Sequence, residues 1–393
     1  QASAVDRHAA LRSLVQAGEQ GYVQVEKPLR LVLKESDISH LSETEKKVRL
    51  DAAMAANALA PFDLERDLLL RAELLCLDAD SWAFLLCAHH IAVDGWSCQI
   101  LAEEFVRLYA DKASAGAGLE PPALRYSDFA GWQVAWLQSP EAARQLAYWR
   151  STLQDAPAFH ALLPGAPGAT GRIFAKLDLG DLGEGLQEAA SQAGATVLVL
   201  LHAALGAAVA RAGGEADVVL GSSVLNRRHR AYESVVGCFI NQIALRLDCS
   251  GDPSFGELIQ RSRRRVIDAQ QHQDYPFHRL VELLNPVRRE ASNPLFQIMI
   301  NLDASSGSGS HVAADIAFDR LPDVALPPKM DMTLFVERAG ERHDAWIEAR
   351  PDRIDPAIVS ILCKLMPHLL RQGLAHPDVP LSQLGWGTAV EAR

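Results

Sequence analysis

The sequence has little positive charge, no paired cysteine motif and no long apolar segment. Its 38 lysines and arginines stand against 49 aspartates and glutamates, which gives a formal net charge of −11. A chain this acidic lacks the positive field that gathers phosphate backbones, so we do not expect a nucleic-acid-binding protein. The six cysteines form no CxxC pair and no zinc-type spacing. We expect them to be small apolar side chains in a reducing compartment, which favours the cytoplasm.

Two further absences concern membranes and targeting. The longest apolar run, residues 195–210, is too short to span a bilayer and is interrupted by His202. The chain begins at Gln1 without an initiating methionine and without a charged-then-apolar signal layout. We therefore expect no membrane span, and we expect an interior piece of a longer chain.

What is present is the composition of an ordinary globular protein. Hydrophobic residues make up 49% and charged residues 22% of 393 residues, enough for two or three domains or one large body. Hydrophobic periodicity predicts alternating strands and helices, which indicates a mixed α/β protein. The predicted strands are 29–33, 68–77, 81–89, 173–179, 217–221, 295–302, 333–337 and 344–349, and the predicted helices are 42–59, 96–115, 182–192, 196–212, 254–271 and 356–372. Residues 303–328 are predicted to be a long loop.

The clearest chemical signal is the string HHIAVDGWS at residues 89–97. His89 and His90 end a predicted strand, and a helix is predicted to start just after Asp94 and Gly95. A histidine with an ordinary pKa near 6.5 is mostly neutral at neutral pH and can accept a proton from an attacking nucleophile. Gly95 would let the backbone approach a ligand, and the helix start would offer N–H groups to a developing oxyanion.

Structural alternatives stay open for the same residues. A histidine at the end of an apolar strand is often a hydrogen-bonded core residue, and Asp-Gly is a common turn. Adjacent histidines on a strand point to opposite faces, and no third ligand stands at a suitable spacing, so we expect no metal site. The basic runs 227–230 and 261–265 are either solvated faces or docking sites for an anionic partner.

Several ordered motifs make the chain similar to one family. HHIAVDGWS resembles the signature of the condensation domains of nonribosomal peptide synthetases, within the acyltransferase group that includes chloramphenicol acetyltransferase. In the family's order, further stretches resemble RHxxLR (7–12), PFDL (61–64), YxDFAxWQ (126–133), GxFVNTxxLR (237–246), HQDxPF (272–277) and NPLFQ (293–297). Gln242, His278 and Ala291-Ser292 depart from those motifs, and these departures concern the substrate more than the reaction.

The resemblance implies an α/β fold of two chloramphenicol-acetyltransferase-like lobes, arranged as a V-shaped pseudo-dimer with a tunnel between them. The expected N-terminal lobe is 1–157, without the family's first strand, and the expected C-terminal lobe is 158–393. The Pro-, Gly- and Ala-rich segment 151–172 marks the boundary between them. The loop 303–328 is a candidate latch that crosses between the lobes.

The resemblance also implies an activity and a set of site residues. The enzyme would transfer an acyl or peptidyl group from the phosphopantetheine thioester of a donor carrier protein to an amine on a second carrier protein, with no bound cofactor. Alternatives are an ester-forming or chain-releasing enzyme, an epimerization domain, and a noncatalytic recruitment platform of the same fold. The expected residues are catalytic His90, Asp94, Gly95 and His89; substrate-binding Trp96, Ser97, Asn241 and Tyr126; and structural Arg12, Arg246 and Trp132.

Within this set, some roles are open and one pairing is specific. His90 would act as general base or would position the amine. Asp94 would be structural and paired with an arginine such as Arg12 or Arg246. For Asn241 a turn or strand-end role is equally compatible with the sequence, and the Tyr126 segment is also compatible with packing alone.

Overall fold

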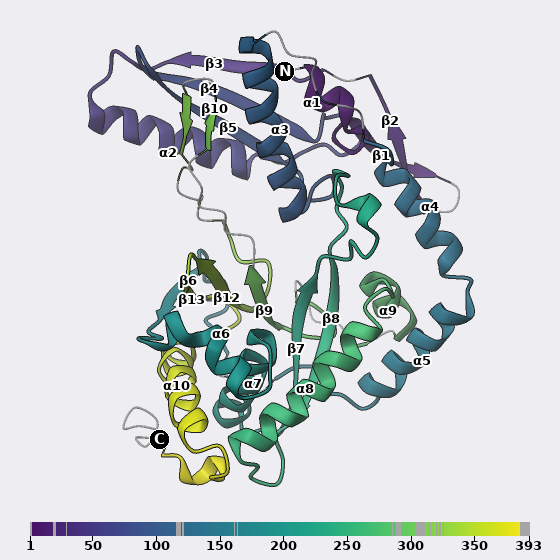
Figure 1. Cartoon of the computed structure of the whole chain (residues 1–393), viewed down its shortest axis with the longest axis vertical. Helices are drawn as coiled ribbons and strands as arrows, with labels where there is room; N and C mark the ends of the chain where they lie inside the picture. The colour runs from purple at the N-terminus through teal and green to yellow at the C-terminus, as the bar shows by residue number, and fades with distance from the viewer. Residues whose placement is uncertain are drawn as a thin grey trace. The chain divides into compact units, whose positions relative to one another are not determined.

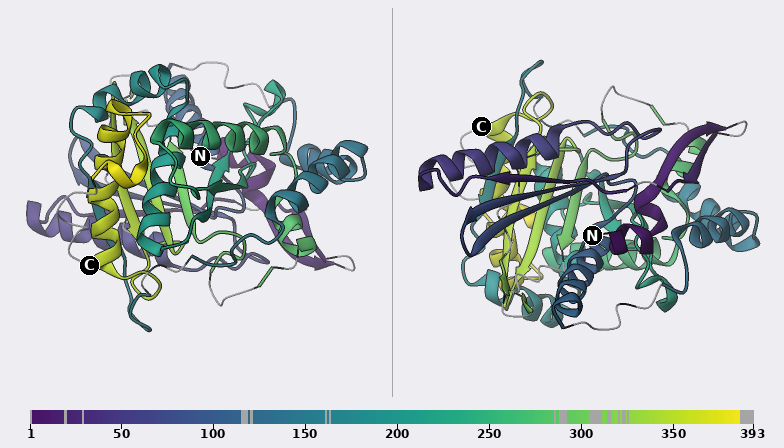
Figure 2. Two further views of the ribbon diagram at one scale, coloured as in Figure 1. Left: turned by 90° about the horizontal axis from the view of Figure 1, so that it is seen from below. Right: turned by 90° about the horizontal axis from the view of Figure 1, so that it is seen from above.

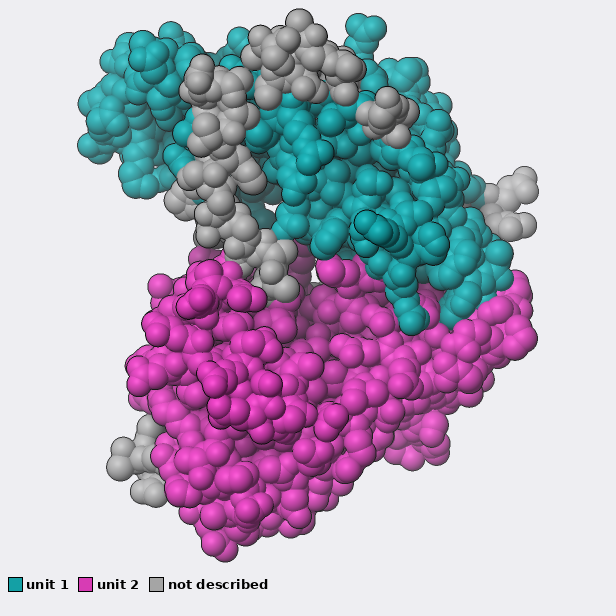
Figure 3. Space-filling model, viewed as in Figure 1, with its two compact units in different colours: residues 1–136, 227–240, 308–326 teal, residues 137–226, 241–307, 327–393 magenta. Residues whose placement is uncertain are grey.

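The computed structural model divides into two compact units (Figure 3). Unit 1 comprises Gln1–Trp136, Arg227–Ile240 and Ser308–Leu326, and unit 2 comprises Leu137–Asn226, Asn241–Gly307 and Pro327–Arg393. The residues that the structure describes are 2–18, 21–28, 30–114, 119, 122–160, 162, 164–284, 286–287, 292–303, 311–313, 316–319, 321, 324 and 326–385. Each unit is therefore assembled from stretches that are far apart in the sequence.

Unit 1 contains a small sheet with helices and two separate hairpins (Figure 1). Its described elements are α1 (Ala2–Arg7), η1 (Ala9–Arg12), β1 (Ser13–Gly18), β2 (Gly21–Glu26), β3 (Leu33–Asp37), α2 (Glu43–Leu59), β4 (Leu70–Asp78), β5 (Ser81–Ala88), α3 (Gly95–Ser114), α4 (Tyr126–Trp136), η2 (Arg230–Tyr232), β10 (His311–Ala313) and β11 (Ile316–Phe318).

The three-stranded sheet of unit 1 carries the segment with the histidine pair. Its order is β3-β4-β5, with β3 parallel to β4 and β4 antiparallel to β5. Buried Leu75 and Leu85 on the sheet pack with Ala53 of α2. Helix α2 begins where the sequence predicts, because Ser42 and Glu45 form a reciprocal capping box at its N-terminus.

Unit 2 is built on a six-stranded mixed sheet. Its described elements are α5 (Pro140–Leu153), β6 (Ile173–Leu177), α6 (Leu182–Gln192), α7 (Val197–Gly213), β7 (Asp217–Val224), β8 (Asn241–Asp248), α8 (Phe255–Gln271), α9 (Phe277–Leu284), β9 (Ile298–Asp303), β12 (Met332–Ala339), β13 (Arg342–Ala349), α10 (Pro356–Ala375) and η3 (Leu381–Gln383). The strand order is β6-β13-β12-β9-β7-β8, in which β9 runs parallel to β12 and to β7 and the other pairs are antiparallel.

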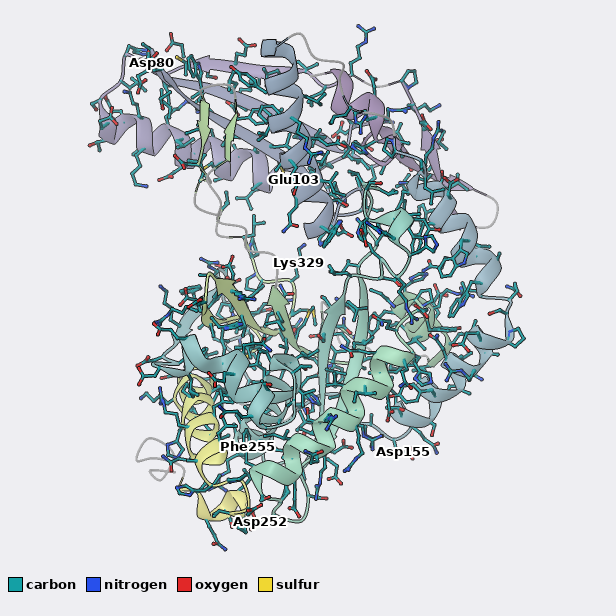
Figure 4. All side chains as sticks on the ribbon, viewed as in Figure 1. Asp80, Glu103, Asp155, Asp252, Phe255 and Lys329 are labelled. Atoms are coloured by element: carbon teal, nitrogen blue, oxygen red, sulfur yellow. The ribbon has the colours of Figure 1, made fainter. Side chains whose placement is uncertain are left out.

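Helices α7, α8 and α10 cover one face of this sheet, as the left view of Figure 2 shows. Helix α7 is almost entirely buried, which agrees with its apolar, alanine-rich sequence. Helices α8 and α10 approach closely at Gly373, where an added Cβ would lie 2.4 Å from the ring of Phe255. Phe255 opens α8 and is labelled in Figure 4.

The two compact units differ from the predicted lobes 1–157 and 158–393. Those lobes describe two related halves of the chain, and they remain a prediction. Helix α5 belongs to unit 2 because buried Trp149 donates from its indole nitrogen to the His272 carbonyl (2.9 Å). In the same helix, Gln145 Nε2 donates to Asp274 Oδ2 (3.1 Å). The latch role of residues 303–328 also stays a prediction, although residues Ser308–Leu326 group with unit 1.

Several predicted elements need correction. The strand predicted at 29–33 is wrong, since β3 runs from Leu33 to Asp37 and Leu29 lies outside the described residues. The segment predicted as a plain loop contains the paired strands β10 and β11, and parts of it lie outside the described residues. Helices α4, α5 and α9 and strands β1, β2 and β8 were not among the predicted elements.

No single helix among the described residues is long and apolar enough to cross a membrane. Helices α6 and α7 meet the criterion only together, and they are bent by 102° at the break between them.

Candidate functional site

The HHIAVDGWS segment turns from the end of β5 into α3, within unit 1 (Figure 1). Strand β5 ends at Ala88, and the His89 amide still donates to the Leu69 carbonyl (3.0 Å). The His89 ring accepts at Nδ1 from the Ile91 amide (3.1 Å) and lies edge-on to Phe62. These contacts favour the structural alternative for His89, and its predicted catalytic role stays a prediction.

His90 is exposed and has a defined tautomer. Its Nδ1 lies 2.7 Å from the Val93 carbonyl oxygen, which can only accept, so Nδ1 carries the proton. In the neutral ring the lone pair is therefore on Nε2, the nitrogen that faces away from this bond. The same Nδ1 is 3.8 Å from the sulfur of Cys238.

Asp94 is buried and caps helix α3. Its Oδ1 accepts from the Ser97 amide (2.8 Å) and from the Ser97 hydroxyl (2.7 Å), and its Oδ2 accepts from the Phe239 amide (3.0 Å). Because this side chain satisfies the first turn of α3, the Ser97 N–H is not offered to a ligand. The sequence predicted that the N–H groups at the start of this helix are available to a developing oxyanion. For the Ser97 N–H that prediction is wrong, because Asp94 accepts from it.

The arginine that pairs with Asp94 is Arg227. Its Nη2 lies 3.0 Å from Oδ1 and 3.2 Å from Oδ2, and the two side chains are only 3% and 1% exposed. The guanidinium also donates from Nη1 to the carbonyls of Tyr232 (2.6 Å) and Val235 (2.7 Å). Burial lowers the pKa of Arg227, and Asp94 opposes that shift.

The predicted pairing of Asp94 with Arg12 or Arg246 is therefore wrong. Arg12 forms an ion pair with Glu26 and donates to the carbonyls of Val5 and Asp6. Arg246 lies in unit 2, where its Nη2 is 2.7 Å from Asp217 Oδ2. Both arginines keep a structural role, but with other partners.

No local sequence signal singles out Arg227. It lies 133 residues from Asp94 and opens the basic run 227–230, which was interpreted as a solvated face or a docking site. The run is divided in the structure, because the Arg227 side chain is buried whereas Arg228 and Arg230 are exposed.

Ser97 and Trp96 hold the segment Arg227–Ile240 against the start of α3. The Ser97 hydroxyl accepts from the Gly237 amide (3.0 Å) and lies 2.7 Å from the Gly237 carbonyl oxygen. The Trp96 indole donates to the Glu233 carbonyl (2.8 Å). Both residues were predicted to bind substrate, and the polar groups that they use here bind the protein's own backbone.

Tyr126 is held in the same way. Its hydroxyl donates to the Cys238 carbonyl (2.9 Å), and its ring covers Gly237 so closely that a Cβ there would lie 2.2 Å from Tyr126 Cδ2. Burial, with smaller effects from Cys238 and Asp94, raises the pKa of Tyr126 to about 12. These contacts favour the packing role that the sequence left open for the motif that begins at Tyr126.

Gly95 differs from Gly237 because nothing in the fold requires its lack of a side chain. A Cβ on Gly95 would meet no heavy atom within 4 Å among the described residues, and its backbone is in a helical rather than a left-handed conformation. The open space beside this exposed glycine agrees with the expected approach of a ligand.

Two predicted site residues remain, Asn241 and Trp132. Asn241, in unit 2, donates from Nδ2 to the carbonyls of Gln273 (2.8 Å) and Tyr275 (2.9 Å) and accepts from the Phe277 amide (3.0 Å). These bonds favour its structural alternative. Trp132 is 45% exposed and stacks on Phe129 in α4, which agrees with a packing role.

The metal-binding side chains and the cysteines were both part of the sequence-based expectations. Among the described residues, no three His, Cys, Asp or Glu side chains come together in a group that could hold a metal ion. The six cysteines are free thiols.

The chain is similar in sequence to several peptide synthetases. The family model of the condensation domain matches residues 2–392. Phosphinothricin tripeptide synthetase PhsB of Streptomyces viridochromogenes is 34% identical over 97% of this chain and 33% of its own length. Malpibaldin synthetase of Mortierella alpina is 37% identical over 72% of this chain, and a linear gramicidin synthase of Brevibacillus parabrevis is 31% identical over 97%. The chain spans only 5% of the length of each of these last two relatives.

Solved structures share the fold. The X-domain from teicoplanin biosynthesis aligns with a TM-score of 0.82 at 24% identity, covering 97% of this chain and 87% of that one. The starter condensation domain of rhizomide synthetase aligns with a TM-score of 0.80 at 20% identity, covering 97% and 86%. The expected α/β fold with two chloramphenicol-acetyltransferase-like lobes is thereby confirmed. With its motifs, its fold and a family match that spans nearly every residue, the chain belongs to the condensation domains of nonribosomal peptide synthetases, which are acyl-transferring enzymes that form amide bonds.

Proposed function

We propose that this condensation domain transfers an acyl or peptidyl group from a carrier-protein phosphopantetheine thioester to an acceptor amine, and that His90 takes the proton of that amine. The observation that carries the proposal is the tautomer of His90. Because Nδ1 donates to the Val93 carbonyl, the exposed ring presents the lone pair of Nε2, which is the form that a base or a positioning acceptor needs.

The proposed step balances as a simple acyl transfer. The amine nitrogen attacks the thioester carbonyl carbon, and a C–N bond forms while the carbonyl oxygen takes up negative charge. The amine proton passes to His90 Nε2, the C–S bond breaks, and the proton returns from His90 to the departing sulfur. The products are an amide and the free phosphopantetheine thiol, and no oxidant, metal or bound cofactor enters the balance.

The residues around His90 would act through its position. Asp94 and Arg227 form the buried ion pair that fixes the turn after His90. Gly95 leaves open space at the start of α3, where a Cβ would meet nothing. We assign Asp94 a structural role and Gly95 a role in substrate approach, and we assign Ser97, Trp96 and Tyr126 to the support of the turn rather than to the substrate.

Donor and acceptor carrier proteins are the proposed partners, and the cytoplasm is the proposed compartment. The relatives are synthetases much longer than this chain, which supports a partner carrier protein on each side of the reaction. An alcohol in place of the amine would give an ester by the same proton transfer. A noncatalytic platform is the second alternative, and one similar solved structure is a complex of an X-domain with OxyB.

A mass-spectrometric transfer assay tests the proposal. Acyl-loaded carrier protein is incubated with the purified chain and with amine or alcohol acceptors, and the product mass distinguishes amide from ester. We expect His90→Ala to lose at least a hundredfold in transfer while it keeps the melting temperature of the wild type. His40→Ala, at an exposed histidine of the same unit, is the matched control and should transfer normally. Near-normal transfer by His90→Ala would refute the role of His90, and tight partner binding without turnover would favour the platform.

A further inference from the structure

We propose that Cys238 is a positioning residue for His90, an inference that rests on the proposed function. The Cys238 sulfur lies 3.8 Å from His90 Nδ1, on the edge of the ring that already donates to the Val93 carbonyl. Sulfur is a weak acceptor. The thiol therefore supports the protonated Nδ1 and helps to keep Nε2 free for the substrate.

The backbone around Cys238 is fixed from both sides by the buried cluster. The preceding residue, Gly237, is hydrogen-bonded through its amide to the Ser97 hydroxyl, and the following residue, Phe239, donates its amide to Asp94. The carbonyl of Cys238 itself accepts from the Tyr126 hydroxyl (2.9 Å). A backbone held at three successive residues fixes where the Cβ of Cys238 lies, so the fold places the thiol within reach of His90 Nδ1.

The arrangement gives the buried ion pair a second consequence. Asp94 and Arg227 fix the turn that carries His90. Asp94 also accepts from the Phe239 amide, and this bond fixes the segment that carries Cys238. Among the described residues, the titratable groups that interact with this cluster include Asp94, Arg227, Tyr126, Cys98 and Cys238 itself, and Asp94 and Arg227 neutralise one another. Both contacts of the His90 Nδ1 edge thus depend on a single buried carboxylate.

Position 238 is not assigned by the motifs that identified the family. In the stretch that resembles GxFVNTxxLR, Cys238 occupies the unspecified second position, between Gly237 and Phe239. The contact with His90 therefore comes from the geometry of this chain rather than from the signature.

The test is a set of substitutions that change the acceptor at position 238. Removal of the sulfur in Cys238→Ala should lower kcat about three- to tenfold with KM unchanged, because only the orientation of His90 is loosened. Cys238→Ser keeps a small polar acceptor and should recover to within about twofold of the wild type. Cys76→Ala, at another half-buried cysteine of unit 1, is the matched control and should leave kcat unchanged.

A charged variant and a spectroscopic measurement separate positioning from folding. A carboxylate in Cys238→Asp, about 4 Å from Nδ1, would favour the protonated ring and move the acidic limb of the kcat/KM profile up by about one pH unit. The nitrogen chemical shifts of the His90 ring report the tautomer in every variant, including any with too little activity to assay. The positioning role alone would be overturned by the following result: the wild type transfers normally, and Cys238→Ala and Cys238→Asp show the same rate, pH profile and His90 tautomer as the wild type. A wild type that transfers no acyl group would overturn the proposed function as well.

Discussion

Replacing Asp94 by asparagine is the sharpest test of the buried cluster. The change keeps the shape of the side chain but removes the charge that faces Arg227, whose own side chain is only 3% exposed. The asparagine also places an NH2 group where one carboxylate oxygen accepted, so either the Phe239 amide or the Ser97 and Arg227 donors lose their acceptor.

The expected cost follows from the burial of both partners. Breaking one side of a buried ion pair leaves an uncompensated charge and typically costs about 3–5 kcal/mol. For a cooperative unit of this size, each kcal/mol shifts the melting temperature by about 2–4 °C, so we expect Asp94→Asn to melt about 6–20 °C below the wild type. Transfer activity should fall with the fold.

The assay is thermal and urea unfolding of three variants. Asp217→Asn is the matched control, because its ion pair with Arg246 lies 23% and 39% exposed and should contribute less than about 1 kcal/mol. The double variant Asp94→Asn with Arg227→Met should recover part of the loss, because it removes the unpaired guanidinium. A melting temperature of Asp94→Asn within 2 °C of the wild type would refute the buried pairing.

Two other predictions concern a glycine and a buried histidine. Gly95→Ala should keep or slightly raise the melting temperature, since alanine favours helices and its Cβ would meet no heavy atom within 4 Å among the described residues. Because a ligand is proposed to occupy that space, the variant should lose at least tenfold in acyl transfer. Unchanged transfer would contradict the approach of a ligand at Gly95. Burial lowers the pKa of His202 from its usual 6.5 to about 4. Between these two pH values His202 is protonated in the unfolded chain but neutral in the folded chain, so the folded state loses stability as the pH falls below 6.5. Unfolding in urea should show a loss of about 2 kcal/mol between pH 7 and pH 5. In His202→Gln this loss should be smaller by that amount, and an equal loss in both proteins would contradict the assignment.

Elements with strong local signals were predicted well from the sequence. Helix α6 has the predicted bounds, and α2 and α8 start after Ser42 and Ser254, whose capping boxes are readable as Ser-x-x-Glu. Helix α4 was missed because apolar residues lie all around it, so no periodic stripe marks it as a helix. Strand β3 was misplaced because it is an edge strand whose exposed Lys34 and Glu35 interrupt the apolar pattern.

The sequence named residues for the candidate site but not their partners. His90, Asp94 and the need for an arginine follow from chemistry and from a motif; the structure shows that Asp94 pairs with an arginine, and the roles of His90 and Asp94 in the reaction stay predictions. The choice of Arg227 over Arg12 or Arg246 depends on how the chain returns to α3 after more than a hundred residues. Non-local pairing of this kind has no local signature, and the same holds for the bonds of Ser97, Trp96 and Tyr126 to the segment Arg227–Ile240.

The path of the chain has a consequence for folding and for protein engineering. Unit 1 is complete only after Arg227–Ile240 and Ser308–Leu326 have been added to its first 136 residues. During synthesis Asp94 therefore emerges long before its counter-ion, and the high contact order predicts slow completion of this unit. A chimera joined at a single point near Trp136 would combine the Asp94 of one parent with the Arg227 segment of the other. Exchanges between synthetases that keep all three stretches from one parent should preserve the cluster that single-crossover exchanges disrupt.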